Sequence, residues 1–143
     1  MDQRKQSEQI IRAVLEAAHP AASVRRAVGA LPVCHGRTIL LAVGKAACAM
    51  AAAAFACPAF SADEALIITK HGHQNPKELN NLAKDRCRRI RIREAGHPVP
   101  DAAGYAATEE ALHMTANLTE SDRIILLLSG GGSALFEKAV VAA

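Results

Sequence analysis

The chain has 143 residues, enough for one domain with its own core, and half of them are hydrophobic although only 3% are aromatic. A core of alanine, valine, isoleucine and leucine suits helices packed closely on a parallel sheet. The net charge of +3 is too small to argue by itself for nucleic-acid binding. No apolar run reaches the roughly 20 residues of a membrane-spanning helix.

Hydrophobic periodicity predicts helices and strands that alternate along the chain. In chain order we predict helix 3–18, helix 23–30, strand 37–43, helix 45–57, strand 65–69, helix 76–84, strand 89–93, helix 102–117 and strand 124–128. Pro20 ends the first helix, and Asp101 is a plausible N-cap for the last one. Strands separated by helices indicate an α/β fold with a mostly parallel sheet.

The cysteines show no metal-binding or redox motif. There is no C-x-x-C pair and no histidine at zinc-finger spacing, so we predict reduced thiols in a cytoplasmic protein. The N-terminal residues 1–9 are polar and charged, without the pattern of a signal peptide. The four cysteines are Cys34, Cys48, Cys57 and Cys87.

The segment 123–134 combines a predicted strand, three consecutive glycines between Ser129 and Ser133, and a helix-like stretch. Glycines at such a turn allow backbone conformations with positive φ and leave N–H groups free to face a ligand. Beside a helix N-terminus, those donors suit a phosphate or a carboxylate. We therefore predict an anion-binding loop, and the alternative is a tight turn that binds nothing.

A second strand end carries Gly44 and Lys45, directly after the predicted strand 37–43. Ligands of open α/β sheets bind outside the carboxyl ends of the strands, so the lysine and the glycine loop could converge on one phosphorylated ligand. Neither element matches a Walker A sequence or a G-x-G-x-x-G dinucleotide motif. Taken alone, Lys45 is better explained as a solvated lysine at the start of a helix.

Histidines follow two further predicted strands. On an extended chain, His71 and His73 would lie on the same side. Without a third ligand nearby they are weak evidence for a metal, so we predict hydrogen-bonded or substrate-facing histidines and no metal site. His97 lies in a loop framed by prolines, just before Asp101.

The segment 84–93 is rich in lysine and arginine. A nucleic-acid site would require stacking aromatic residues or a recognisable binding fold beside these charges, and the sequence indicates neither. We expect a solvated helix end and a half-exposed strand that carries arginines, with no nucleic-acid partner.

Four loops together carry a resemblance to a known family. They read V-G-K-A-A at 43–47, T-K-H-G-H at 69–73, E-A-G-H-P-V-P-D-A-A-G at 94–104 and L-L-S-G-G-G-S-A-L at 127–135. In this order they resemble the N-terminal domain of glycerate 2-kinases of the MOFRL-associated family, some members of which carry the label hydroxypyruvate reductase. Four ordered motifs are far more specific than one glycine loop.

The resemblance implies a Rossmann-like α/β domain that uses ATP and Mg²⁺ to phosphorylate the 2-hydroxyl of D-glycerate. Lys45 matches the family's catalytic lysine, whose charge would stabilise the transferring phosphoryl group. Lys70 and His73 match a motif near the interdomain cleft, His97 is a further cleft candidate, and His71 stands where an aromatic residue is more usual. The residues that match the nucleotide-phosphate loop are Ser129, Gly130, Gly131, Gly132 and Ser133.

The family's chains are considerably longer, with a second domain that supplies further catalytic groups. We therefore expect residues 1–143 to form a truncated N-terminal domain with little or no turnover alone, which a separately encoded C-terminal half would complete. Its last strand is expected to leave an apolar face or an unpaired edge exposed. The alternatives are a hydroxypyruvate reductase, disfavoured by the missing dinucleotide motif, and a non-catalytic module that binds nucleotides or sugar acids.

Overall fold

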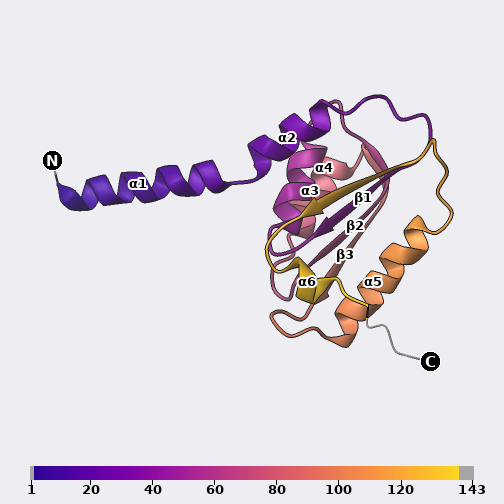
Figure 1. Ribbon diagram of the computed structural model, residues 1–143. Helices are drawn as coiled ribbons and strands as arrows, with labels where there is room; N and C mark the ends of the chain where they lie inside the picture. Colours follow the sequence, from indigo (N-terminus) through magenta and orange to yellow (C-terminus); the bar gives the residue numbers. More distant parts are fainter. Residues whose placement is uncertain (1, 139–143) are drawn as a thin grey trace.

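The computed structural model describes residues 2–138, apart from the side chain of Glu78, and these residues form a four-stranded sheet with helices on both faces (Figure 1). The strands are β1 (Thr38–Val43), β2 (Ala62–Lys70), β3 (Cys87–Ala95) and β4 (Arg123–Leu128), in the spatial order β3-β2-β1-β4. All three strand pairs are parallel. The expected α/β fold with a parallel sheet is therefore confirmed.

The described part of the chain contains six helices, five of which pack near the strands. They are α1 (Gln3–Ala18), α2 (Ala21–Gly29), α3 (Ala47–Phe55), α4 (Pro76–Ala83), α5 (Ala102–Thr115) and α6 (Gly132–Leu135). α2, α3 and α4 pack on one face of the sheet, and α5 and α6 pack on the other (Figure 1). The helix-like stretch expected after the glycine loop is short, because Phe136 leaves the helical conformation, with φ −141° and ψ 77°. Residues 139–143 of that stretch lie outside the described part of the chain.

The centre of the sheet is fully buried. Every residue of β1 is buried, as its continuous apolar run predicts for an inner strand of a parallel sheet. The alanine-rich α3 buries all of its residues except Ala49, which is half-buried, and its small side chains let the helix lie close to the sheet. Asp101 begins α5 as predicted, because its Oδ1 accepts the N–H of Gly104 at 2.9 Å.

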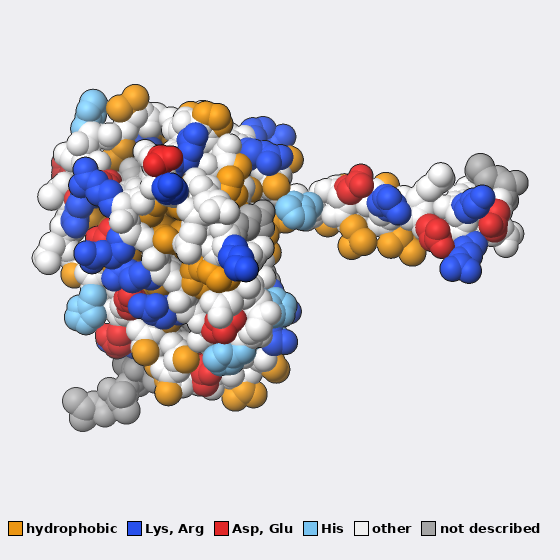
Figure 2. All heavy atoms as spheres, turned by 180° about the vertical axis from the view of Figure 1, so that it is seen from behind, with side chains coloured by type: hydrophobic (Ala, Val, Ile, Leu, Met, Phe, Trp, Pro, Cys, Tyr) orange, Lys and Arg blue, Asp and Glu red, His pale blue; other side chains and the backbone are white. Residues whose placement is uncertain are grey.

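Two apolar surfaces remain exposed. On β4, Ile124, Leu126 and Leu128 are 44%, 55% and 62% exposed, because α5 packs over the other strands and leaves this face of β4 uncovered. The apolar face expected at the last strand is therefore confirmed. α1 buries none of its residues and stands away from the body, with apolar side chains along one side (Figures 1 and 2).

Two expectations from the sequence concern the cysteines and membrane-spanning helices. All four cysteines are free thiols, as predicted, and two of them, Cys48 and Cys57, are buried. Within residues 2–138, no helix combines the length and the apolar character needed to cross a bilayer.

Candidate functional site

The four loops singled out in the sequence meet at one edge of the sheet. β1 ends at Val43, β2 at Lys70, β3 at Ala95 and β4 at Leu128, and the parallel pairing places all four ends together. In open α/β sheets this carboxyl edge is where ligands bind. The parallel pairing of the four strands therefore brings the lysine, the histidine loops and the glycine loop to one edge of the sheet.

Hydrogen bonds connect the loop after β1 to the loop after β4. The Lys45 N–H donates to the Gly130 carbonyl oxygen at 3.0 Å, and the Ala46 N–H donates to Ser129 Oγ at 3.0 Å. Gly44 has a φ of +118°, and a Cβ added there would lie 2.6 Å from the Ser129 carbonyl oxygen. Because only glycine permits both this conformation and this approach, Gly44 and Ser129 fix the relative position of the two loops.

Gly131 is the point where three candidate groups meet. Its φ is +89°, and a Cβ added to it would lie 2.8 Å from the His97 ring and 3.3 Å from Lys45 Cε. The Lys45 side chain is exposed, and none of the carboxylates that the structure describes forms an ion pair with it. The structure thus places a lysine and a histidine directly against the glycine loop.

The N–H groups of the glycine loop fall into two sets. The Ser129 N–H donates to the Val43 carbonyl oxygen at 2.9 Å, and the Gly132 N–H donates to the Ser129 carbonyl oxygen at 3.3 Å. Within the described part of the chain, the N–H groups of Gly130 and Gly131 have no acceptor. Two such donors beside a lysine are suited to an oxyanion such as a phosphate.

The loop after β2 is tied to the loop after β3. Glu94 Oε1 accepts the N–H of Gly72 at 2.8 Å and that of Gln74 at 3.3 Å. His71 Nε2 lies 2.9 Å from Asp101 Oδ2. The hydrogen bond from His71, together with backbone N–H bonds, lowers the pKa of Asp101 to about 2, so this carboxylate is charged throughout the neutral pH range.

His71 and His73 have different surroundings, contrary to the expectation that they share one side. That expectation assumed an extended chain, but Gly72 has a φ of +77° and the His73 N–H donates to the Lys70 carbonyl oxygen at 3.0 Å, which closes a turn. His71 therefore reaches Asp101, and His73 lines a hollow. Among the side chains that the structure describes, no group of three or more histidine, cysteine or acidic residues is placed to hold a metal ion.

The hollow beside Lys45 has a volume of about 180 Å³. It is lined by Lys45, Cys48, Ala49, Ala52, His73, Asn75 and Leu79. Burial raises the pKa of the Cys48 thiol, so this cysteine is protonated at neutral pH and is not a nucleophile. Lys70, a candidate from the sequence, lies at the end of β2 and is not among the described residues that line the hollow.

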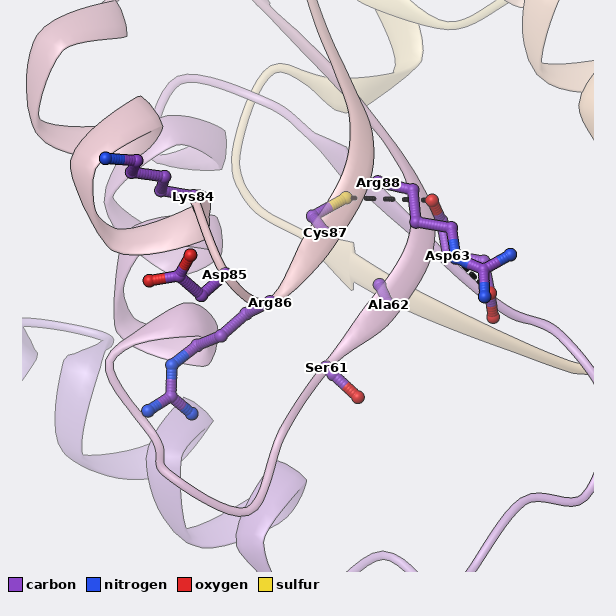
Figure 3. A pocket seen from close by; sticks show the side chains of 8 residues that line it. All are labelled: Ser61, Ala62, Asp63, Lys84, Asp85, Arg86, Cys87 and Arg88. Carbon is purple, nitrogen blue, oxygen red and sulfur yellow. Dashed lines mark hydrogen bonds and ion pairs between the residues drawn. The ribbon is translucent and has the colours of Figure 1, made fainter.

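A larger hollow, of about 360 Å³, lies at the opposite end of the sheet, where β2 and β3 begin (Figure 3). Its basic residues do not converge on one point: Arg86 donates to the Cys57 carbonyl oxygen at 2.9 Å, and Arg88 lies 3.8 Å from Asp63. The arginines further along β3 also pair with carboxylates. We therefore assign the candidate site to the carboxyl edge and not to this hollow.

Sequence reasoning gave no role to several residues that shape the site. Glu94 had a detectable signal, because it is an acidic residue at the end of a predicted strand and the two histidines follow the neighbouring strand. Ala49 and Ala52 had none, since they lie in a uniformly apolar helix where any alanine looks the same. Asn75 was visible only as a residue before a proline.

Fold and loops together define a Rossmann-like α/β domain with a lysine and a glycine-rich loop at the carboxyl edge of its sheet. The chain belongs to the family described as Domain of unknown function (DUF4147), which matches residues 6–142. The expected relationship to the N-terminal domain of the glycerate 2-kinases of the MOFRL-associated family is thereby confirmed.

Two relatives and a solved structure support this assignment. The chain is 36% identical to the D-glycerate 2-kinase of Thermotoga maritima over 94% of its own length and 30% of that protein. It is 34% identical to a putative hydroxypyruvate reductase of Agrobacterium vitis, over 90% of its length and 28% of the relative. A crystal structure of a Thermotoga maritima glycerate kinase matches with a TM-score of 0.76 over 94% of this chain and 30% of that one. The chain thus spans about 30% of the length of these relatives.

Proposed function

We propose that the chain provides the nucleotide-phosphate loop and the catalytic lysine of a glycerate 2-kinase, which transfers the γ-phosphoryl group of ATP to the 2-hydroxyl of D-glycerate. The observation that carries this proposal is the meeting of Lys45 with the acceptor-free N–H groups of Gly130 and Gly131. The similarity to a protein named D-glycerate 2-kinase supplies the substrate. Four free thiols favour the cytoplasm as its location.

Catalysis by this site is electrostatic. The Gly130 and Gly131 N–H groups would hold phosphate oxygens, and the Lys45 ammonium group would neutralise charge on the phosphoryl group during its transfer. Because Ser129 and Gly44 already fix the loop, these donors need little reorganisation when the charge develops. Ser133 would lie at the edge of the same phosphate site, and His97 packs against the loop and supports it.

Mg²⁺ bound together with ATP would neutralise part of the charge of the phosphates. The residues that this structure describes hold no cluster of carboxylates or histidines suited to a metal ion. We therefore assign no ligand for Mg²⁺ to the described residues of this chain. The part that we propose for residues 2–138 is to bind the phosphates of ATP.

A transfer assay tests the proposal with two proteins. Residues 1–143 alone span about 30% of the relatives, so we expect them to bind Mg·ATP but to form no measurable 2-phosphoglycerate. A chimera in which this chain replaces the matching segment of the Thermotoga maritima kinase is expected to label D-glycerate from radiolabelled ATP. A folded but inactive chimera would contradict the kinase proposal. Turnover by residues 1–143 alone would contradict the need for a second domain or a separately encoded C-terminal half.

One relative's name favours a second candidate activity, the reduction of hydroxypyruvate. The loop Ser129–Ser133 lacks the G-x-G-x-x-G pattern through which dinucleotides bind α/β domains, so we expect the chimera not to oxidise NADH in the presence of hydroxypyruvate. Oxidation of NADH would replace the kinase proposal. Binding of ATP without any transfer by the folded chimera would favour a non-catalytic binding module.

A further inference from the structure

We propose that the 180 Å³ hollow beside Lys45 is the pocket for the phosphoryl acceptor, and that the alanine face of α3 limits it to short hydroxy acids. The inference rests on the proposed function and adds to it the location and the size limit of the acceptor. Three elements build the hollow: the start of α3, the loop after β2 and the first turns of α4.

The charge of the hollow favours an anionic guest. Lys45 and His73 line it, and no carboxylate is among the described residues of its lining. Glu94, which anchors the His73 loop, is engaged by the N–H groups of Gly72 and Gln74. A carboxylate in the hollow would therefore meet the Lys45 ammonium group and the His73 ring, while the negative charge of Glu94 reaches as far as Cys48, whose pKa it helps to raise.

The walls of the hollow set the size of its guest. Ala49 and Ala52 are three residues apart on α3, so their methyl groups lie on one helical face, opposite Leu79 of α4. The hollow's volume of about 180 Å³ lies below the roughly 300–1,000 Å³ of pockets that hold drug-sized ligands, so the hollow suits a small acid. A longer side chain in place of either alanine would occupy this space.

The position of Lys45 connects the hollow to the phosphate loop. Its stem passes 3.3 Å from the Cβ position of Gly131, and the residue also lines the hollow. In the transfer, the acceptor hydroxyl oxygen bonds to the γ-phosphorus while the bond from phosphorus to the bridging oxygen of ADP breaks. ADP leaves with that oxygen, and the hydroxyl proton passes to solvent. Lys45 is placed to contact both the acceptor and the phosphoryl group.

The test is a binding titration of the 143-residue chain with D-glycerate and, separately, with Mg·ATP, followed by amide chemical shifts. Ala49→Leu is expected to weaken D-glycerate binding at least tenfold and to change Mg·ATP binding less than twofold. Ala56→Leu, the same change at an exposed position just after α3, serves as the matched control and should leave both unchanged. The unmodified chain should also bind D-gluconate, a six-carbon hydroxy acid, far more weakly than D-glycerate.

A second variant covers the case in which Ala49→Leu disturbs the helix. His73→Gln changes an exposed side chain and should weaken D-glycerate binding while leaving Mg·ATP binding intact. Unaltered D-glycerate binding in both variants, or no D-glycerate binding by the unmodified chain, would overturn the acceptor pocket. Failure of Mg·ATP to bind would instead overturn the proposed function, so the two results are read separately.

Discussion

Replacing Lys45 with methionine is expected to slow phosphoryl transfer by the chimera roughly a hundredfold to a thousandfold, the usual effect of removing one charge-stabilising group. Methionine keeps most of the aliphatic stem that lies against Gly131 but removes the ammonium group. Because Lys45 is exposed and forms no ion pair with any described carboxylate, its loss should leave the thermal unfolding midpoint nearly unchanged. Single-turnover rates at saturating ATP measure the effect.

Lys77→Met is the matched control for this substitution. Lys77 is an exposed lysine of α4 and is not among the residues that line the hollow beside Lys45. It should retain the full transfer rate. Equal rates for Lys45→Met and the unmodified chimera would show that Lys45 takes no part in the transfer, whether or not the glycine loop binds ATP.

Gly131→Ala is expected to abolish Mg·ATP binding and to lower the free energy of unfolding by about 1–2 kcal/mol, the cost of a left-handed conformation for a residue with a Cβ. The φ of Gly131 is +89°, and the added methyl group would lie 2.8 Å from the His97 ring. Relief of that contact requires the loop or the histidine to move, which displaces the Gly130 and Gly131 N–H groups. Urea unfolding and an ATP titration measure the two effects.

The neighbouring glycine supplies the control for this prediction. Gly130 does not have a positive φ, and a Cβ added to it meets no atom within 4 Å. Gly130→Ala should therefore change stability by less than about 0.5 kcal/mol and keep most of the ATP affinity. Equal losses in the two alanine variants would show that the loop conformation is not what binding depends on.

The fold was largely predictable because burial and hydrophobic pattern agree in the sheet. The continuous apolar run of β1 predicts an inner strand buried on both faces, and the structure places β1 between β2 and β4. The arginines of β3 alternate with isoleucines and predict a half-exposed strand, and β3 lies at an edge. The strand order itself was not predictable, because it depends on which strands pair across the fold and leaves no local signal.

For α1, the hydrophobic pattern predicted the helix but not its surroundings. Its periodic apolar residues predicted the helix correctly, but the pattern also implies a partner for the apolar side. In the structure Ile10, Ile11, Val14 and Leu15 are 59–66% exposed. Amphipathic periodicity predicts a helix and the side of it that favours burial. It does not indicate which surface, if any, covers that side.

At the site, the sequence predicted the groups that occupy strand ends and missed those that depend on tertiary contacts. Lys45 and the glycine loop were identifiable because each directly follows a strand. The pairing of His71 with Asp101 depends on the turn at Gly72 and on the register between β2 and β3. The hollow depends on the packing of α3 against α4, which no residue in either helix reveals alone. The roles of these residues in binding stay predictions.

The most direct test of the central claim is a titration of the isotopically labelled 143-residue chain with Mg·ATP, observed by backbone amide resonances. We predict the largest shifts at Gly130 and Gly131, with smaller ones at Lys45 and His97, because these groups surround the proposed phosphate position. No shifts at millimolar ATP would contradict the account. Shifts confined to residues 84–88, at the opposite end of the sheet, would contradict it as well.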